Sequence, residues 1–337
     1  MSERAYDTSD TKTLFLGTND GLQKSITCAA ELLKAGKLVA FPTETVYGLG
    51  ADVTNPDAIA KVFEAKGRPS DNPMIVHVAN LGGIETCAEM DDRVRLLVNA
   101  FMPGPLTLVL PSKESVPLIA RAGLPTVALR IPEHPVALEL IKHVGPLVAP
   151  SANISGRPSP TTARHVIDDL AGRIAAVLDG GLCRVGIEST VLDLTQSVPV
   201  ILRPGVITQL EIEGVLKDKV LLSEEGNESA LEIEEAVKKD IPRSPGTKYR
   251  HYAPGIPIRL VIDQSIPEVR SSGQLVLTTE RHKDRFRERE VMVLSEAMLY
   301  EQFRRAEKAG YEGILIYAQP GELSEGLLNR VKKAEEE

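Results

Sequence analysis

The chain has 337 residues, of which 42% are hydrophobic and 26% are charged, and its formal net charge is −8. This length predicts one very large domain or two ordinary ones, with enough apolar material for a sizeable core. A protein that grips nucleic acid over its whole surface is usually basic, so the acidic balance argues against that class. We expect small-molecule ligands, or RNA contacts through a local patch. Aromatic residues make up 4%, and a largely aliphatic core suits α/β layers.

The three cysteines, Cys28, Cys87 and Cys183, cannot all pair, and none forms a CxxC motif. We therefore expect a reducing, cytoplasmic compartment and interpret each cysteine as a small core residue. Residues 1–10 are polar and lack an apolar signal core, and no run approaches 18 apolar residues. The sequence thus predicts no membrane span.

Short apolar strands alternate with helices from residue 11 to about residue 208, as is typical of an α/β domain. The clearest helix has Asn55 as N-cap, Pro56 at its first position and Gly67 as its C-terminal stop. Further helices are predicted at 23–35, 92–100, 135–143 and 161–170. Strands are predicted at 38–42, 74–78, 107–110, 127–131, 147–149, 189–194 and 200–203.

The composition changes after residue 209, where Glu and Lys become dominant. We interpret residues 210–255 as a linker with a helix at 228–239 and an ordered loop at its end, Ser244–Gly255. Residues 256–337 return to alternation and predict a second, small parallel α/β domain. Its strands are predicted at 258–262, 274–278, 291–294 and 313–317, and its helices at 297–309 and 323–333.

Several familiar motifs are missing from the sequence. There is no GxxxxGK[ST] loop, and Gly48-Leu49-Gly50 lacks the third glycine of a dinucleotide fingerprint. A nucleotide, if one binds, is therefore held in another way. No HExxH, no GxSxG and no Cys/His cluster occurs, which argues against a metalloprotease and a nucleophile-elbow hydrolase.

Polar groups gather in loops next to the predicted strands. Pro42–Gly50 follows one strand and ends in glycine-rich turn chemistry, which presents hydroxyls and backbone N–H groups to ligands. Lys66 and Arg68, stiffened by Pro69 and Pro73, suit a polyphosphate or a carboxylate. Taken singly, these residues have ordinary explanations, such as a lysine that complements a helix dipole. Their clustering favours an anion site.

Alternation along two strands assigns side chains to faces. His77 shares a face with Ile75, while Arg130 shares one with Thr126 and Ala128. An arginine deep in a strand pairs with an acid more often than it contacts a ligand, and both readings stay open. Further along, an apolar strand ends in the polar loop Ala149–Gly156 before a helix begins. Open α/β sheets commonly bind ligands at such a place.

In this order, these segments resemble the threonylcarbamoyl-AMP synthase family, which has the YrdC-like fold. The resemblance spans roughly residues 14–208 and rests on Pro42–Gly50, Lys66–Arg68, Ser151–Asn153, Glu188–Val191 and Arg203–Gly205. The segment Lys248–Pro254 and the α/β tail resemble the longer, two-domain form. The predicted domains are accordingly a YrdC-like catalytic domain at 11–209, a linker with a lid loop at 210–255 and a C-terminal domain at 256–337.

The resemblance implies an open twisted α/β sheet with a large concave cavity, plus a small Rossmann-like parallel α/β domain. It implies a nucleotidyltransferase, L-threonylcarbamoyladenylate synthase, which joins L-threonine, bicarbonate and ATP into threonylcarbamoyl-AMP and pyrophosphate. The product would serve modification of the adenosine 3′ to the anticodon in tRNAs that read codons beginning with A. Implied partners are downstream tRNA threonylcarbamoyl transferase proteins. No membrane and no stable nucleic-acid binding are expected, except local tRNA contact.

The resemblance also implies roles for individual residues, although the division between threonine and ATP stays open. The implied catalytic cations are Lys66 and Arg68. The implied threonine-binding residues are Thr45, His77, Arg130 and Ser189. The implied ATP-binding residues are Arg68, Asn72, Thr126, Ser151, Asn153, Thr161, Arg203 and Tyr249. The implied lid residues are Tyr249, His251 and Tyr252.

The implied reaction joins two anions, so cations and dry walls matter more than a nucleophile. We expect Mg²⁺ to arrive on the ATP phosphates, because no carboxylate cluster in the sequence builds a dedicated cage. Two alternatives stay open. A carbamoyltransferase component would not depend on threonine, and a non-catalytic RNA-binding translation module would bind tRNA without ATP turnover. The acidic balance counts against the second.

Overall fold

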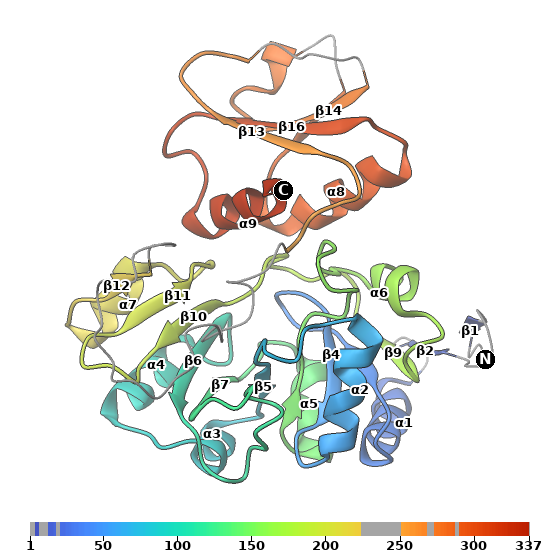
Figure 1. Cartoon of the computed structure of the whole chain (residues 1–337), viewed down its shortest axis with the longest axis vertical. Helices are drawn as coiled ribbons and strands as arrows, with labels where there is room; N and C mark the ends of the chain where they lie inside the picture. The colour runs from blue at the N-terminus through green and yellow to red at the C-terminus, as the bar shows by residue number, and fades with distance from the viewer. Residues whose placement is uncertain are drawn as a thin grey trace.

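The computed structural model of the chain describes residues 4–6, 13–17, 21–223, 251–267, 273–286 and 290–336. These residues form two α/β units that lie one above the other in Figure 1. The predicted helix at 228–239 and Tyr249 lie outside the described residues. Within the described ranges, no helix has both the length and the apolar character needed to cross a bilayer.

The first unit is built on one large mixed sheet. Twelve strands of the described chain form it in the order β1-β2-β9-β3-β4-β8-β5-β7-β6-β10-β11-β12. The strands are β1 (Arg4–Tyr6), β2 (Thr13–Gly17), β3 (Val39–Phe41), β4 (Gly48–Asp52), β5 (Ile75–His77), β6 (Leu106–Pro111), β7 (Thr126–Arg130), β8 (Leu147–Val148), β9 (Ala176–Asp179), β10 (Thr190–Asp193), β11 (Val200–Arg203) and β12 (Leu221–Leu222). The helices are α1 (Leu22–Lys34), α2 (Pro56–Lys66), α3 (Leu81–Cys87), α4 (Asp92–Phe101), α5 (Pro135–Val144), α6 (Ala163–Leu170) and α7 (Gln209–Leu216).

Helices cover both faces of this sheet. Helices α1 and α5 pack together, and their buried side chains share a cluster with Phe41 and Leu178. Helices α2, α3, α4 and α6 contribute to a larger cluster on the other face, together with Leu49 and Val76. The α2 caps are as predicted, since Asn55 accepts the Ala58 N–H and Gly67 takes a left-handed conformation.

The interpretation of Gly48-Leu49-Gly50 as a turn is wrong, because these residues begin β4, which pairs antiparallel with β3. A Cβ added at Gly50 would lie 2.9 Å from Cε1 of Phe41 and 3.0 Å from the carbonyl oxygen of Val39. Glycine is therefore needed here for close approach of two strands rather than for a bend.

The predicted domain boundary at residue 209 falls at the start of helix α7. Helix α7 begins with a capping box between Thr208 and Glu211, and it buries Ile212 in the first unit's core. Strand β12 then pairs in parallel with β11. Residues 209–222 thus extend the first sheet, although the sequence predicts a linker from residue 210 onward.

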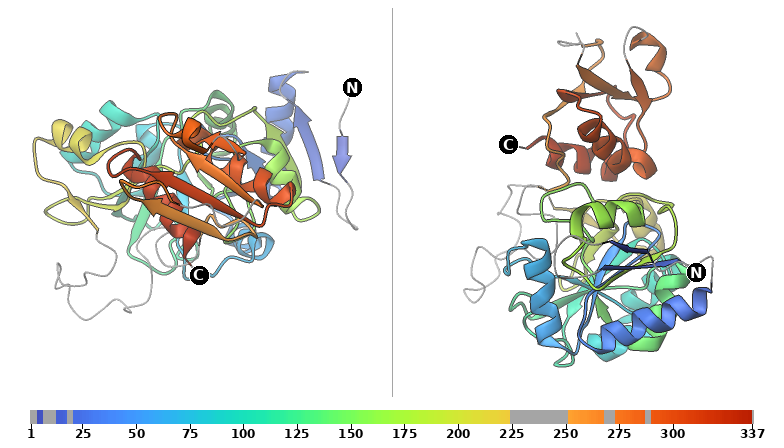
Figure 2. Two further views of the ribbon diagram at one scale, coloured as in Figure 1. Left: turned by 90° about the horizontal axis from the view of Figure 1, so that it is seen from above. Right: turned by 90° about the vertical axis from the view of Figure 1, so that its right-hand side faces the viewer.

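The second unit is the predicted small parallel α/β domain. Its strands are β13 (Ile258–Ile262), β14 (Gln274–Thr278), β15 (Val291–Val293) and β16 (Gly313–Ala318), all parallel in the order β13-β16-β14-β15. Helices α8 (Leu299–Lys308) and α9 (Glu325–Glu335) lie between this sheet and the first unit (Figures 1 and 2). The two helices therefore form the side of the domain that meets the first unit.

We expect Gly50→Ala to lower the free energy of unfolding by about 1–3 kcal/mol, because the new methyl group would overpack the β3–β4 contact. Urea unfolding measures this change. Gly214→Ala in helix α7 is the matched control, since an added Cβ there meets nothing within 4 Å. The control should be neutral or stabilising by up to about 1 kcal/mol. Equal effects of the two substitutions would contradict the close-approach argument.

Candidate functional site

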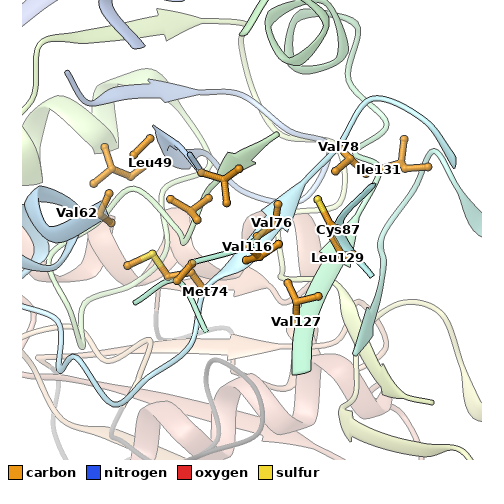
Figure 3. Packing of buried hydrophobic residues seen from close by; sticks show 14 of the residues in the cluster. Leu49, Val62, Met74, Val76, Val78, Cys87, Val116, Val127, Leu129 and Ile131 are labelled. Atoms are coloured by element: carbon orange, nitrogen blue, oxygen red, sulfur yellow. The ribbon is translucent and has the colours of Figure 1, made fainter. Parts of the chain in front are cut away.

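Strands β5 and β7 separate the hydrophobic core from a polar hollow. Figure 3 shows Val76, Val78, Leu129 and Ile131 gathered on the core side of these neighbouring strands. His77 lies directly beside Arg130 in the parallel pair, and both point to the opposite side. The predicted alternation of faces is confirmed, and it brings a histidine and an arginine together in one wall.

The hollow is partly open to solvent and has a cavity volume of about 60 Å³. The described residues that line it are Thr43, Thr45, Val46, Gly48, Arg68, Ile75, His77, Arg130, Ala149, Pro150, Ser151, Glu188, Ser189, Arg203, His251 and Tyr252. Nine of these are site residues predicted from the sequence: Thr45, Arg68, His77, Arg130, Ser151, Ser189, Arg203, His251 and Tyr252. They come from seven separate stretches of the first unit and from the segment before β13.

Arg130 is fixed in three directions. Its Nε donates to the Gly104 carbonyl oxygen at 3.2 Å and one terminal nitrogen donates to Thr45 Oγ1 at 2.9 Å. The other terminal nitrogen lies 2.7 Å from Glu44 Oε1 in an ion pair that is almost fully buried. Arg130 therefore pairs with an acid and also lines the hollow, and its contact with a ligand stays a prediction. The sequence did not single out Glu44 as its partner.

Arg68 and Lys66 are held by backbone carbonyls. Arg68 donates to the carbonyl oxygens of Asn72 at 3.3 Å and Pro73 at 2.8 Å, which aligns it along the proline-stiffened loop. Lys66 does not line the hollow. Its Nζ donates to the carbonyl oxygens of Ser151 and Asn153 at 2.5 and 2.6 Å, beneath the Ser151–Asn153 loop. Burial, reinforced by the nearby Arg68, holds the pKa of Lys66 well below its usual range.

Ser189 and Arg203 form the facing wall. Ser189 Oγ shares a 2.7 Å hydrogen bond with Thr107 Oγ1. Arg203 donates from Nε and a terminal nitrogen to the Ser189 carbonyl oxygen at 3.2 and 3.0 Å. These bonds bring the start of β10 and the end of β11 together, so a cation and a hydroxyl face the hollow side by side.

Glu188 is a wall residue that lies in one of the segments carrying the family resemblance, but no role was predicted for it. It is the only acidic side chain among the described residues that line the hollow. Its Oε1 accepts from Ser159 Oγ at 2.5 Å, and its Oε2 accepts from the Tyr300 hydroxyl and from Arg330 Nε. Burial alone would raise the pKa of Glu188, but Arg330 and Arg203 hold it below its usual value. The Glu188 carboxylate is therefore ionised, and both of its oxygens already accept hydrogen bonds.

Four buried polar atoms around the hollow have no hydrogen-bond partner within the described chain. They are Asn72 Oδ1, His77 Nδ1, Asn153 Oδ1 and His251 Nε2. Buried polar atoms are rarely left unsatisfied in native proteins, so each is a candidate ligand contact. Burial and the nearby Arg130 lower the pKa of His77 to about 3, and burial and the nearby Arg68 lower that of His251 to about 3. Both rings are neutral at pH 7.

The remaining predicted residues lie outside the lining. Thr126 begins β7, on the same face as Arg130 but at the far end of the strand. Asn72 and Asn153 are buried beside the hollow, and Asn153 Nδ2 braces its own loop through the carbonyl oxygens of Ile154 and Arg157. Thr161 is buried, and its backbone N–H donates to His165 Nδ1 at 3.2 Å. Their contacts with ATP stay predictions.

The side chains of the hollow do not form a metal cage. No group of three or more His, Cys, Asp or Glu suited to a metal ion occurs among the described residues. The one acid in the lining, Glu188, already accepts three hydrogen bonds. The donor set therefore fits a divalent cation only if the ion arrives with its own ligands.

We expect the free energy of unfolding to fall by about 2 kcal/mol per ring, for His77 and for His251, between pH 7 and pH 5. The folded pKa lies below the unfolded value of about 6.5, so this stabilisation is complete above pH 6.5 and is lost as pH falls toward 3. Urea unfolding at a series of pH values measures it. His251→Gln should flatten the decline, whereas His143→Gln on the surface of α5 should leave most of it. Identical declines in all three proteins would contradict the assignment.

Comparison with known proteins also divides the chain in two, but the boundary between the two family matches lies before helix α7. Residues 31–205 match the family described as "Telomere recombination", and residues 207–335 match "Threonylcarbamoyl-AMP synthase, C-terminal domain". The chain is 46% identical to the threonylcarbamoyl-AMP synthase of Pyrococcus abyssi over 255 residues, which cover 74% of this chain and 72% of the relative. It is also 46% identical to the Bacillus subtilis threonylcarbamoyl-AMP synthase over 278 residues, which cover 79% and 76% of the two chains.

Two solved structures of Pyrococcus abyssi Sua5 have a similar fold over nearly the whole chain. The fold is similar to that of P. abyssi Sua5 complexed with L-threonine, with a TM-score of 0.76, 38% identity and coverage of 93% of this chain and 94% of the other. A P. abyssi Sua5 variant with an adjacent His–Tyr pair replaced by alanine gives a TM-score of 0.78 and 36% identity, with 96% of both chains covered. The chain therefore belongs to the threonylcarbamoyl-AMP synthase family, whose C-terminal domain it contains at residues 207–335.

Proposed function

We propose that this chain is an L-threonylcarbamoyladenylate synthase, which converts L-threonine, bicarbonate and ATP into threonylcarbamoyl-AMP, pyrophosphate and water. The observation that carries the proposal is the convergence of three arginines, Arg68, Arg130 and Arg203, on one hollow that also offers hydroxyls and neutral histidines. Such a hollow suits two anionic reactants. It contains no serine–histidine–acid arrangement among its described lining residues that would suit a hydrolase.

The reaction joins an amine, a carboxyl source and a phosphate in two steps. The threonine amine attacks the carbon of bicarbonate or CO₂, giving an N-carboxylate, with loss of water when bicarbonate is the donor. An oxygen of that carboxylate then forms a bond to the α-phosphorus of ATP, while the bond to the leaving pyrophosphate breaks. Both reacting groups are anions in the second step, so fixed cations and orientation lower the barrier.

The residue roles follow from position and charge. Threonine would contact Thr45, His77, Arg130 and Ser189, with Arg130 toward its carboxylate. ATP would contact Arg68, Ser151 and Arg203 through its phosphates and ribose. Lys66 would act by holding the Ser151–Asn153 loop, since both of its short contacts are with carbonyls of that loop. Direct contact between Lys66 and substrate stays a prediction.

His251 and Tyr252 would cover bound substrates. The solved P. abyssi variant replaces an adjacent His–Tyr pair, and His251 is the only histidine in this chain that precedes a tyrosine. We further propose that Mg²⁺ arrives on the phosphates of ATP, that transfer proteins pass the product to tRNA, and that the enzyme acts in the cytoplasm. The three free cysteines support a reducing compartment.

We expect pyrophosphate release from ATP and Mg²⁺ to require both threonine and bicarbonate. The measurement adds or omits each substrate in turn. Release without threonine would favour a carbamoyl-transfer component or a plain nucleotide hydrolase. If no release occurs and tRNA binds tightly at physiological salt, the chain is a non-catalytic binding module.

We expect Arg68→Ala to lower turnover by about 100-fold, because the variant loses a preorganised cation beside the transferred phosphate. Stability should change by only about 1 kcal/mol, since the arginine is half-buried and contacts two carbonyls. Arg121→Ala is the matched control, because Arg121 also braces a loop through two carbonyls, those of Val116 and Leu124. Equal losses of turnover in the two variants would count against the role of Arg68.

A further inference from the structure

The hydrophobic core of the C-terminal domain continues into the wall of the hollow. One cluster of buried residues joins Val46, Ile187 and Tyr252 to side chains of α8 and α9, such as Phe303 and Leu327. Val46 and Tyr252 also line the hollow. A change in how the C-terminal domain packs would therefore change the shape of the hollow.

Arg330 of helix α9 is the polar centre of this contact. Its side chain is fully buried, and one guanidinium reaches three acceptors of the first domain. Nε donates to Glu188 Oε2 at 2.7 Å, one terminal nitrogen donates to the Glu188 carbonyl oxygen at 3.1 Å, and the other donates to the Pro204 carbonyl oxygen at 2.9 Å. The same guanidinium lies 5.5 Å from the centre of the Tyr252 ring. Arg330 thus contacts two lining residues of the hollow, Glu188 and Tyr252. It also contacts Pro204, which follows the lining residue Arg203.

Backbone contacts fix the position of Arg330. Gly326 lies four residues before it on the same face of α9, and a Cβ there would meet the Gly205 backbone at 2.8 Å. A Cβ at Gly186, two residues before Glu188, would meet the Ala297 backbone at 2.4 Å. The backbones of the two domains therefore approach each other closely on either side of Glu188. This close approach leaves the Arg330 guanidinium little freedom to move.

Tyr252 needs such support. Its φ is 68°, a left-handed conformation that is strained for a bulky residue. The ring stacks on Tyr300 of α8 with centroids 5.7 Å apart, and the next residue, Ala253, donates its N–H to the Gly156 carbonyl oxygen. A conformation of this kind persists only where its surroundings hold it.

We propose that Arg330 is a positioning residue of the hollow, which holds Glu188, Pro204 and Tyr252 in place and so makes the C-terminal domain part of the active-site wall. The inference rests on the proposed function for the direction of its activity changes. Arg330 does not touch the reacting atoms. It fixes the positions of the Glu188 and Tyr252 side chains. It therefore fixes the shape of the wall against which ATP and threonine would bind.

The test compares Arg330→Lys with Arg304→Lys. Arg304 of α8 is also a nearly buried interdomain arginine, paired with both oxygens of Asp169 at 3.0 and 2.7 Å, but its contacts, Asp169 and Pro158, do not line the hollow. Each substitution keeps the charge and removes the planar fork. We measure kcat and KM for ATP and for threonine, the unfolding temperature, and amide hydrogen exchange in peptides that contain Tyr252 and Ala253.

We expect Arg330→Lys to lower kcat/KM about tenfold or more, because small misplacements of positioning groups are costly. Exchange at Tyr252 and Ala253 should rise, whereas Arg304→Lys should stay within about twofold of the parent in kcat/KM and leave this exchange unchanged. Equal losses in both variants, or a lower unfolding temperature of Arg330→Lys with unchanged kcat/KM and exchange, would overturn the proposal. If Arg330→Lys does not fold, Tyr300→Phe replaces it, since it removes one donor to Glu188 while keeping the stacked ring. The exchange result needs no turnover, so it decides the inference even if the parent releases no pyrophosphate.

Discussion

The arrangement of the two domains depends on two buried carboxylates, Asp169 and Glu188, and Glu188 is the one that lines the hollow. Ser159 approaches this carboxylate from the loop before α6, Tyr300 from α8 and Arg330 from α9. Removing one partner of a buried ion pair typically costs about 3–5 kcal/mol, because the remaining charge cannot return to water. A surface ion pair is worth about 1 kcal/mol or less. The contact at Glu188 therefore dominates over the more exposed interdomain pairs, such as Arg157 with Glu307.

Much of the fold could be predicted from the sequence, because alternation along a strand has a direct physical meaning. The period of two that separated His77 and Arg130 from the apolar residues of their own strands holds in the structure, and those apolar residues, such as Val76 and Leu129, form the core (Figure 3). Helix caps such as Asn55 and Gly67 could also be predicted from the sequence, because each depends only on residues that are close in the chain. The other predicted residues of the hollow were assigned through the family resemblance, from motifs in loops next to predicted strands.

The parts that could not be predicted depend on contacts between distant segments. In the sequence Gly50 resembles a turn residue. Only the pairing of β3 with β4 shows that the close approach of two strands requires glycine at this position. Residues 209–222 look like a linker, because a short helix with one buried apolar side chain has little periodic signal. Arg330 lies in a highly charged stretch that resembles a solvent-facing helix surface, and the sequence does not reveal that Glu188 lies opposite it. Lys66 stands beside Arg68 in the chain, but its amine is directed to the carbonyls of a different loop.

The contacts that position the arginines around the hollow affect how strongly the hollow can attract anions. Arg68 lines the hollow, and two backbone carbonyl oxygens orient its guanidinium. Glu188 would work against the attraction of anions, because a like charge about 4 Å from a phosphate costs about 4 kcal/mol at an effective dielectric constant of about 20. Arg330 offsets that charge from behind the wall, while Arg203 remains on the hollow side. The C-terminal helix thus contributes to the electrostatics of the hollow as well as to its shape, and this joint effect explains why a fully buried arginine stands at the domain contact.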